Sequence, residues 1–552
     1  MSEIVLQHMV MSSNIIDDTD RLFCKTHTSF PISLSVGEIA DFNCHYNVFD
    51  IGTYKKYTGC SDYYLRLRID GEAYVFIQGY GGNEYESTVN VNGESVIPLL
   101  TESNMIGICI KAITQCEIIS ADFCCFYHYR RNVSLSLCIC TYKKEQAVVK
   151  KVSKIKEYYG VLKNNCPDIV ITDNGGTLSN IEGATIVPSN NLGGSGGFAR
   201  AMMYAVEHDA DYIILNDDDA IFEPEVLYRV QTFLSLLNDE DGEIAIGGTM
   251  LDIDHVSAVL ESGAIIENQE HIPLNKGLDV FDINANVELS KDGKADYNGW
   301  WFYVLSRKTI EKNGCPLPLF LKNDDVEYGL RSRPKIVHMV GISVWHPSMT
   351  SRYSSSIRYY DIRNLLVMLS IHDEIIVKKI VSDILLEIAA YRYLNAEAMM
   401  EGLNDFIKGP TYTFKLCKKG MKLLPEEDIK NLNELEKRFD FQDNTSNNVN
   451  YKFRKYTMNG LFLPCVGNAV LSAFCMQTEK YYRIKKILYI IDDEKGFIAE
   501  RDRIRTIKDI VKVMRLGLSL RRRMKVLKSS YKEALAHYSS KKYWKQMFED
   551  DG

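Results

Sequence analysis

The pattern of apolar and polar residues changes twice along the chain and predicts three regions. In residues 1–130, short stretches such as Tyr63–Ile69 and Ala73–Gln78 alternate apolar and polar side chains, with Asp70-Gly71 between them. Alternation with a period of two is typical of strands with one buried face, and Asp-Gly is typical of a hairpin turn. Several such strands with regular turn signals predict a β-sandwich domain. Its many tyrosines fit a glycan-binding surface, and they fit an architectural module equally well.

From residue 131 the pattern becomes that of strands alternating with helices. The strand-like runs are Val133–Cys140, Asp168–Asp173, Ala184–Val187 and Asp211–Leu215. Segments of helical composition, including Lys143–Lys163 and Gly196–His208, lie between them. This alternation predicts an α/β core over residues 131–365, with a mainly parallel sheet and helices on both faces. Ligands of such folds bind at the carboxyl ends of the strands.

Beyond residue 365 the sequence is helical in composition and predicts a helical domain over residues 366–552, with Leu386–Met400 as a strong example. Within it, residues 501–545 contain 15 Lys and Arg against three Asp and Glu, with apolar residues between them. A basic amphipathic segment is typical of helices that lie on an anionic membrane surface. An ordinary solvated helix face is the alternative.

Composition narrows the class of protein. The net charge of −8 argues against nucleic-acid binding, because a surface that neutralises phosphates is usually basic. No run approaches the ~20 apolar residues of a membrane span, and the first residues lack a signal-peptide pattern, so we expect a cytoplasmic protein, at most bound to a membrane surface. None of the 14 cysteines forms a Cys-x-x-Cys pair, which argues against a structural zinc site.

The strongest chemical signal is the run Asn216-Asp217-Asp218-Asp219, directly after the apolar strand Asp211–Leu215. Three carboxylates crowded at a strand end repel one another unless a cation offsets the repulsion. Mg²⁺ and Mn²⁺ take oxygen ligands and often share them with substrate phosphates. The run therefore predicts a site where a metal and a phosphorylated substrate meet, with a solvated acidic turn as the alternative.

Two further segments add candidate binding residues. Asn190–Arg200 is a glycine-rich turn that opens a helix, where the glycines permit close approach of a ligand and the helix N-terminus favours an anion. Asp296–Phe302 places Trp300 beside Trp301. Neighbours on an extended segment face opposite ways, so at most one indole can stack on a sugar, and core packing of both is the alternative.

Two more segments add candidate catalytic residues. Asp324 and Asp325 begin a short predicted helix, whose N-terminus favours the ionised carboxylate that a general base requires. Capping of the helix by one of them is the alternative. His346 ends the strand-like segment Gly341–Pro347 and could complete a metal site beside the acidic run, although a lone histidine is more often structural.

Together these segments resemble the inverting family 2 glycosyltransferases of the GT-A fold, and in particular the bacterial galactofuranosyltransferases that polymerise cell-wall galactan from UDP-galactofuranose. The similar segments follow the family's order: Asn191–Arg200, Asp217–Asp219 with Glu223-Pro224, Tyr297–Trp301, Pro318–Asp325 with Tyr328–Arg331, and Trp345-His346. The resemblance implies a Rossmann-like GT-A core and extends to the N-terminal β region and the helical tail.

The resemblance also implies roles for individual residues. The metal ligands for Mn²⁺ or Mg²⁺, held against the UDP diphosphate, would be Asp217, Asp219 and His346. The base that deprotonates the acceptor hydroxyl would be Asp325, and the acceptor site would include Trp300, Trp301 and Asp324. The donor site would include Thr141, Asp173, Asn174, Asn191, Gly193, Gly194, Arg200 and Asp218.

The activity that the resemblance implies is inverting transfer of galactofuranose from UDP-galactofuranose to a glycan or lipid-linked glycan acceptor, in cell-surface polysaccharide synthesis. The basic C-terminal segment would contact the inner face of the cell membrane. The alternatives are a transferase of the same fold with another donor, such as dTDP-rhamnose or a UDP-hexose, and a non-catalytic glycan-binding scaffold. Cys140–Lys144 departs from the Asn-Arg-Pro of similar sequences, so the uracil contacts need not be the family's. The sequence leaves the oligomeric state open, a homo-oligomer included.

Overall fold

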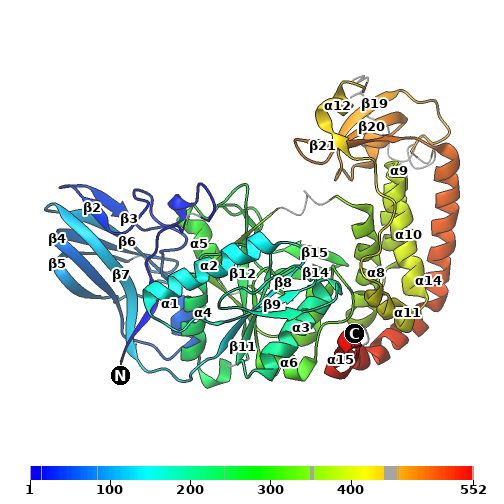
Figure 1. The fold of residues 1–552 in the computed structure, drawn as a ribbon. Helices are drawn as coiled ribbons and strands as arrows, with labels where there is room; N and C mark the ends of the chain where they lie inside the picture. The colour runs from blue at the N-terminus through cyan, green and yellow to red at the C-terminus, as the bar shows by residue number, and fades with distance from the viewer. Residues whose placement is uncertain are drawn as a thin grey trace.

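The structure is a computed structural model that describes residues 2–13, 15–83, 85–241, 243–291, 293–347, 353–439, 457 and 459–549. Figure 1 shows an N-terminal sheet, a central α/β core and a C-terminal helical region that follow one another across the molecule. The long helix α14 (Arg503–Tyr538) forms the outer edge of the C-terminal region, and α15 (Lys541–Glu549) returns to the core beside α3 (Gly193–Glu207).

The N-terminal region is an antiparallel sheet, as the alternating pattern predicts. Its strands are β1 (Ser2–His8), β2 (Ile32–Leu34), β3 (Ile39–Asp41), β4 (Tyr63–Tyr80), β5 (Tyr85–Pro98), β6 (Met105–Ala112) and β7 (Cys116–Tyr127). The order is β1-β7-β4-β6-β3, with β2 on β7 and β5 on β4. The prediction of two packed sheets is not confirmed. The 18-residue strand β4 pairs with β5 along one edge and with β7 and then β6 along the other, which joins the strands into one hydrogen-bonded sheet.

Two buried contacts fasten the N-terminal region to the core. Glu225, at the start of α4 (Glu225–Leu236), accepts hydrogen bonds from the backbone N–H of His8 at 2.9 Å and from Arg229 Nε at 3.2 Å. His45 lies 2.8 Å through Nε2 from the hydroxyl of Ser343 on β17 (Ile336–His346). Burial lowers the pKa of His45 to about 4, so this imidazole is neutral at pH 7.

The core holds an eight-stranded sheet in the order β10-β9-β8-β11-β16-β12-β13, with β17 on β12. Its strands are β8 (Leu135–Thr141), β9 (Asp168–Asp173), β10 (Thr185–Pro188), β11 (Tyr212–Asp217), β12 (Ala245–Asp252), β13 (Val259–Glu261), β16 (Tyr303–Ser306) and β17. Its helices are α2 (Glu145–Leu162), α3, α4, α5 (Ile283–Leu289), α6 (Arg307–Asn313) and α7 (Asp324–Ser332), and β14 (Ala264–Glu267) pairs with β15 (Glu270–Pro273) apart from the main sheet. The four strands β10, β9, β8 and β11 are parallel to one another, and β12 and β17 run in the same direction. Only β16 and β13 run the other way, so the sheet is mixed but mainly parallel.

Strand direction brings the predicted site residues to one edge of this sheet. In the parallel strands, Asp217 pairs with Cys140 and Thr141 pairs with Asp173, so these strand ends are level. Because β16 reverses direction between β11 and β12, strand β12 and its parallel partner β17 run the same way as β11. His346, the last residue of β17, therefore lies at the same edge as Asp217.

The C-terminal region is not wholly helical, which corrects the prediction for residues 366–552. Its helices are α8 (Ser355–His372), α9 (Val377–Ala389), α10 (Tyr393–Ile407), α11 (Pro410–Lys415), α12 (Leu432–Glu436), α14 and α15. A small sheet in the order β18-β21-β20-β19 adds β18 (Lys430–Asn431), β19 (Gly467–Ser472), β20 (Ile484–Ile490) and β21 (Lys495–Glu500). It forms because buried Ile487, Tyr489 and Phe497 on the hairpin β20-β21 pack into the same core as the helices. The boundary predicted at residue 365 lies inside α8, and among the described residues no helix is both long and apolar enough to cross a membrane.

The C-terminal end of the chain packs against the segment that leads to Asp324. Trp544 on α15 is fully buried, and its indole N–H donates to the carbonyl of Pro316 at 2.9 Å. The backbone N–H of Cys315 donates to the carbonyl of Ser539 at 2.8 Å. The helical region is thus attached to the segment that precedes α7, the helix on which the candidate base Asp325 lies.

Candidate active site

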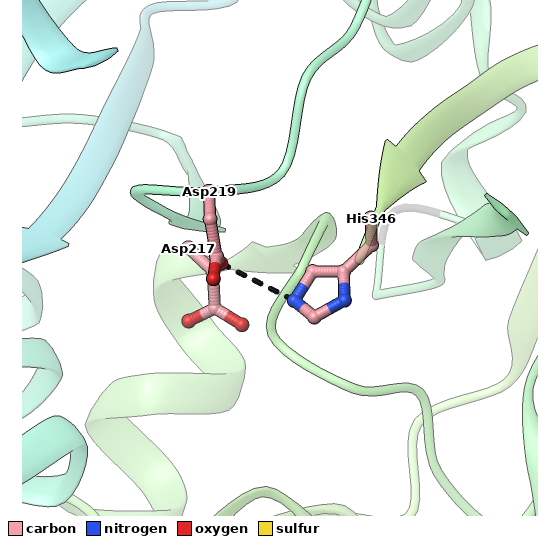
Figure 2. A group of neighbouring side chains, drawn as sticks. All are labelled: Asp217, Asp219 and His346. Carbon is pink, nitrogen blue, oxygen red and sulfur yellow. Dashed lines mark ion pairs between the residues drawn. The ribbon is translucent and has the colours of Figure 1, made fainter. Parts of the chain in front are cut away.

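Asp217, Asp219 and His346 come together at the carboxyl edge of the sheet, as the sequence predicts. One ligand atom from each lies within 4.8 Å of the others. Figure 2 shows the two carboxylates and the imidazole gathered at the end of β17, with His346 Nε2 3.2 Å from an oxygen of Asp219. A backbone bridge between Ile221 and Trp345 brings the turn after the acidic run beside β17, which explains how Asp219 reaches His346.

The orientation of His346 suits a metal ligand. Its Nδ1 lies 2.7 Å from the carbonyl of Pro347, so a proton on Nδ1 donates there, and Nε2, on the side of Asp219, is the nitrogen that a metal would bind after losing its proton. Burial lowers the pKa of His346, but the hydrogen bond and charge of Asp219 outweigh burial and raise the pKa overall. Two carboxylates and one imidazole form a donor set that suits Mn²⁺, and Mg²⁺ less closely because it prefers oxygen ligands.

The third carboxylate, Asp218, points toward β8 rather than toward His346. It accepts a hydrogen bond from the Thr141 hydroxyl at 2.9 Å, and Lys144 lies 3.1 Å away. The same Lys144 ammonium is 2.8 Å from Asp219. Asp218 and Thr141 therefore lie together on the side of the acidic run that faces β8.

Two lysines that the sequence analysis did not single out supply positive charge. Lys144 pairs with Asp218 and Asp219, and Lys151 on α2 donates to the backbone carbonyl of Asp217 at 2.7 Å. Burial lowers the pKa of Lys151 to about 8, against the opposing effect of the three carboxylates. Its signal in the sequence was its place on the apolar stripe of α2, three residues after the buried Val148.

Burial and mutual repulsion raise the pKa values of the carboxylates at this edge. Burial, and then the charge of Asp219, raises the pKa of Asp217 to about 6. Asp324, at the start of α7, accepts a hydrogen bond from the Ser195 hydroxyl at 3.0 Å, yet burial and the charge of Asp325 raise its pKa to about 7. Burial also raises the pKa of Asp325, which is half-buried and accepts from the N–H of Val326 at 2.8 Å. The pair can therefore hold a proton near neutral pH.

Three side chains beside Asp325 form a hydrogen-bonded chain that the sequence did not reveal. His271 on β15 lies 2.5 Å through Nδ1 from the Tyr297 hydroxyl and 2.7 Å through Nε2 from a carboxylate oxygen of Glu261. The charge of Asp325 contributes to a raised pKa of His271, after the opposing effect of burial and the larger effect of Glu261. Single residues on three separate segments give no local pattern, so only the fold reveals this chain.

The other predicted donor residues line the edge from β9 to α3. Asp173 accepts from the N–H groups of Gly175, Gly176 and Leu178 at 2.8–3.0 Å, so its carboxylate holds the turn after β9. Asn174 donates to the carbonyl of Gly193 at 3.0 Å, and its own Oδ1 is buried without a partner among the described residues.

The glycine-rich turn serves packing within the chain as well as approach of a ligand. Asn191 accepts from the N–H of Gly193 at 3.2 Å, and Gly194 lies beside Asp324. Gly193 has a φ of +69°, and a Cβ there would lie 2.0 Å from the carbonyl oxygen of Phe320. The turn therefore lies directly against the loop that precedes Asp324.

Three predicted residues occupy other surroundings. Trp300 is 4% and Trp301 9% exposed. Both indoles therefore pack in the core, rather than offering a face on which a sugar could stack. Trp300 contacts Phe198 edge-on, and Trp301 donates through Nε1 to the carbonyl of Gly248 at 2.8 Å. Arg200 packs its guanidinium 4.7 Å from the Phe548 ring and lines a 470 Å³ cavity between α3, β10 and α15, so it is not brought to the acidic run.

Comparison with known proteins adds a sequence relationship. No family model matches the chain. The chain is 28% identical over 255 residues to a curated protein from Mycobacterium tuberculosis named galactofuranosyltransferase GlfT2, and 27% identical over 253 residues to the protein of the same name from Mycolicibacterium smegmatis. Each match covers 42% of this chain and about 40% of the relative, so the chain spans well under half the length of the curated relatives it matches.

Similar solved structures include a mannosyltransferase from Pyrobaculum calidifontis in complex with GDP-Man and Mn²⁺, with 12% identity, a TM-score of 0.28 and coverage of 44% of this chain and 66% of that one. Another is a mannosyl-3-phosphoglycerate synthase from Rubrobacter xylanophilus, with 12% identity, a TM-score of 0.27 and coverage of 43% and 74%. TM-scores this low support no conclusion about fold or activity. The resemblance to galactofuranosyltransferases that the motifs predict is confirmed by the two sequence matches.

Proposed function

We propose that this chain is an inverting, metal-dependent glycosyltransferase that moves galactofuranose from UDP-galactofuranose to a glycan or lipid-linked glycan acceptor. The observation that carries the proposal is the convergence of two carboxylate sites at one sheet edge. Asp217 and Asp219 lie with His346, whereas Asp324 and Asp325 begin α7 on a separate segment. The sequence similarity to proteins named galactofuranosyltransferase supports the choice of donor.

On the donor side, Asp217, Asp219 and His346 would hold Mn²⁺ or Mg²⁺. When bound, the metal would supply positive charge that stabilises the diphosphate leaving group. Lys144, which is half-exposed and already contacts Asp218 and Asp219, provides a second cation within reach of the same group. Thr141, Asn174 and Gly193 border this position and would contact the nucleotide.

On the acceptor side, Asp325 would act as the general base. An acceptor hydroxyl attacks the anomeric carbon, its proton passes to Asp325, and the bond from that carbon to the UDP oxygen breaks. In-line attack opposite UDP inverts the anomeric centre, and a single carboxylate base suffices for this step. Asp324, whose pKa of about 7 allows it to carry a proton, would hydrogen-bond a sugar hydroxyl.

Helix α14 carries a surface that fits peripheral binding to an anionic membrane. Ile504, Ile507, Val511, Met514 and Leu518 are 43–69% exposed and repeat every three or four residues, so they form one stripe. The exposed cations beside this stripe and farther along the helix are Lys508, Lys512, Arg515, Arg521, Arg522, Arg523 and Lys525. An apolar stripe flanked by cations is typical of helices that lie in the interface of an anionic bilayer.

The choice of donor is tested by incubating the purified chain with Mn²⁺, a panel of synthetic glycan acceptors, and UDP-galactofuranose, UDP-glucose or dTDP-rhamnose. We expect mass spectrometry to detect addition of hexose residues from UDP-galactofuranose at a rate at least tenfold above that from the other donors. A preference for another donor would replace the donor in the proposal. No transfer from any donor would favour a glycan-binding scaffold.

Asp325→Asn removes the proposed base and should lower kcat by about 10²–10⁴-fold, the usual contribution of a general base. The affinity for UDP with Mn²⁺ should stay within about threefold, because Asp325 is not among the proposed metal ligands. In the unaltered chain, kcat should fall as the pH drops through the raised pKa of Asp325, at a higher pH than for an ordinary aspartate.

The matched control for this test is Asp383→Asn on α9, another half-buried carboxylate whose pKa burial raises. It should leave kcat within about twofold. Full activity of Asp325→Asn would refute the assignment of the base.

Membrane contact is tested by co-sedimentation with vesicles of phosphatidylcholine alone or with phosphatidylglycerol. We expect binding only to the anionic vesicles. The double variant Val511→Asp, Leu518→Asp should bind them at least tenfold more weakly, because charge on the apolar stripe opposes its burial in the membrane interface. Leu423→Asp, which alters an 80% exposed leucine outside α14, should bind as the unaltered chain does. Equal binding by both variants would contradict the assignment of α14 as the membrane contact.

A further inference from the structure

The loop that leads to Asp324 and Asp325 has an unfavourable backbone conformation. Phe320, Lys322 and Asn323 have φ values of +75°, +67° and +60°, and Asp324 follows immediately. Residues with a Cβ rarely adopt this left-handed conformation, because Cβ approaches the following carbonyl. Three such residues within four positions persist only if the surroundings hold them.

One buried side chain holds this loop by three carbonyl groups. Asn364, on α8, donates through Nδ2 to the carbonyl oxygens of Leu319 at 3.1 Å, Leu321 at 2.7 Å and Lys322 at 2.9 Å. Asn364 is fully buried. Because its amide has only two N–H groups for three acceptors, at least one hydrogen is shared between two carbonyls.

A neighbouring residue fixes the orientation of that amide. Arg363, also buried, donates through Nε to Asn364 Oδ1 at 2.8 Å, so the amide nitrogen faces the loop. Its Nη2 donates to the carbonyl of Leu319 at 2.6 Å. Arg363 in turn lies against Tyr359, whose hydroxyl donates to Asp405 at 2.9 Å. Arg363 and Asn364 on α8 are thus held, through Tyr359, against Asp405 on α10.

The opposite side of the loop rests on α3. The backbone N–H of Ser195 donates to the carbonyl of Phe320 at 3.2 Å, and its hydroxyl donates to Asp324. The loop is therefore held between α3, which belongs to the proposed donor side, and α8, which belongs to the helical region. The position of the loop sets where α7 begins, and so where Asp325 lies relative to Asp217, Asp219 and His346.

We propose that Asn364 is a positioning residue, which holds the loop 319–323, with Phe320, Lys322 and Asn323 in the left-handed conformation, and thereby places Asp325 for proton abstraction. This rests on the proposed function of Asp325. Loss of the hydrogen bonds from Asn364 to the loop (the Asn364 clamp) lets the loop relax toward ordinary backbone conformations and displaces Asp325. A displacement of about 1 Å at a reacting group lowers turnover by up to ~10²-fold without removing any catalytic atom.

The test compares Asn364→Ala with Asn395→Ala, which removes another fully buried asparagine amide of the helical region, one that contacts Ser355, Tyr353 and Glu387 instead of the loop. We expect similar decreases in Tm for the two variants. Well below Tm, Asn364→Ala should lower kcat about 30–100-fold, with KM for the donor and the Kd of UDP with Mn²⁺ within about threefold. Asn395→Ala should keep kcat within about threefold.

Hydrogen exchange gives a readout that does not need turnover. In Asn364→Ala, the backbone amides of residues 319–326 should exchange at least tenfold faster than in the unaltered chain, and those of β11 and β17 should not change. Faster exchange in a chain that transfers no sugar would support the clamp and refute the proposed function. Unchanged exchange in this loop would overturn the clamp, whatever the activity.

A double-mutant cycle tests the backbone conformation itself. Lys322→Gly removes the steric barrier to positive φ at one of the three positions. It also removes a positive charge near Asp325, but this effect on kcat is the same with and without Asn364 and cancels in the cycle. The effect of Lys322→Gly on kcat should be about 3–10-fold more favourable in Asn364→Ala than in the unaltered chain. Equal effects in both backgrounds would overturn the proposal.

Discussion

The crowding of five buried or half-buried carboxylates at one edge of the sheet is the constraint on which the candidate site depends. Asp217, Asp218 and Asp219 follow one another at the end of β11, and Asp324 and Asp325 lie at the same edge of the sheet. Burial, and after it the charge of a neighbouring carboxylate, raises the pKa of Asp217 to about 6 and of Asp324 to about 7, so the ionised forms are disfavoured here. The arrangement is stable only because other groups supply positive charge or donated hydrogen bonds.

Those compensating groups come from several different elements. Lys144 follows β8, Lys151 lies on α2, His346 ends β17, and the Ser195 hydroxyl on α3 donates to Asp324. In this account a divalent cation completes the compensation when the donor binds. The acidic run follows strand β11 of the sheet, whereas Asp325 lies at the start of α7, after a loop whose carbonyl groups accept hydrogen bonds from Asn364 of the helical region. Helix α3 contacts the same loop through Ser195, so the donor side and the acceptor side of the proposed site are physically connected.

A site residue could be predicted when a local sequence pattern marks it, and could not when only the fold brings it to the site. Asp217 and Asp219 lie two residues apart at a strand end, and His346 ends a strand of its own, so general rules for α/β sheets place all three at one edge, and the resemblance joined them into a metal site. Lys151 was missed because a lysine on a helix face reads as solvated, and only the fold shows that it reaches Asp217. The Glu261–His271–Tyr297 chain joins single residues from three segments, which no local pattern encodes.

The errors in the prediction of fold and site have equally physical causes. Trp300 and Trp301 were expected to line the acceptor site, but a large apolar side chain gains more from burial, and both are in the core. The small sheet β18 to β21 was read as helical sequence, because its strands are short and lie among long helices. The single sheet of the N-terminal region depends on one continuous strand, β4, whose two halves read as separate strands around Asp70-Gly71.

Calorimetric titration of UDP, with Mn²⁺ and with a chelator, tests most directly whether Asp217, Asp219 and His346 hold a metal against the donor; it compares the unaltered chain with Asp219→Asn and His346→Gln. The account predicts that Mn²⁺ strengthens UDP binding by at least tenfold, and that either substitution abolishes most of this gain. Because the ligands must be deprotonated, the gain should grow as the pH rises through the pKa of Asp217, about 6, and the raised pKa of His346. UDP binding of equal strength with chelator, or a full gain in both variants, would contradict the account.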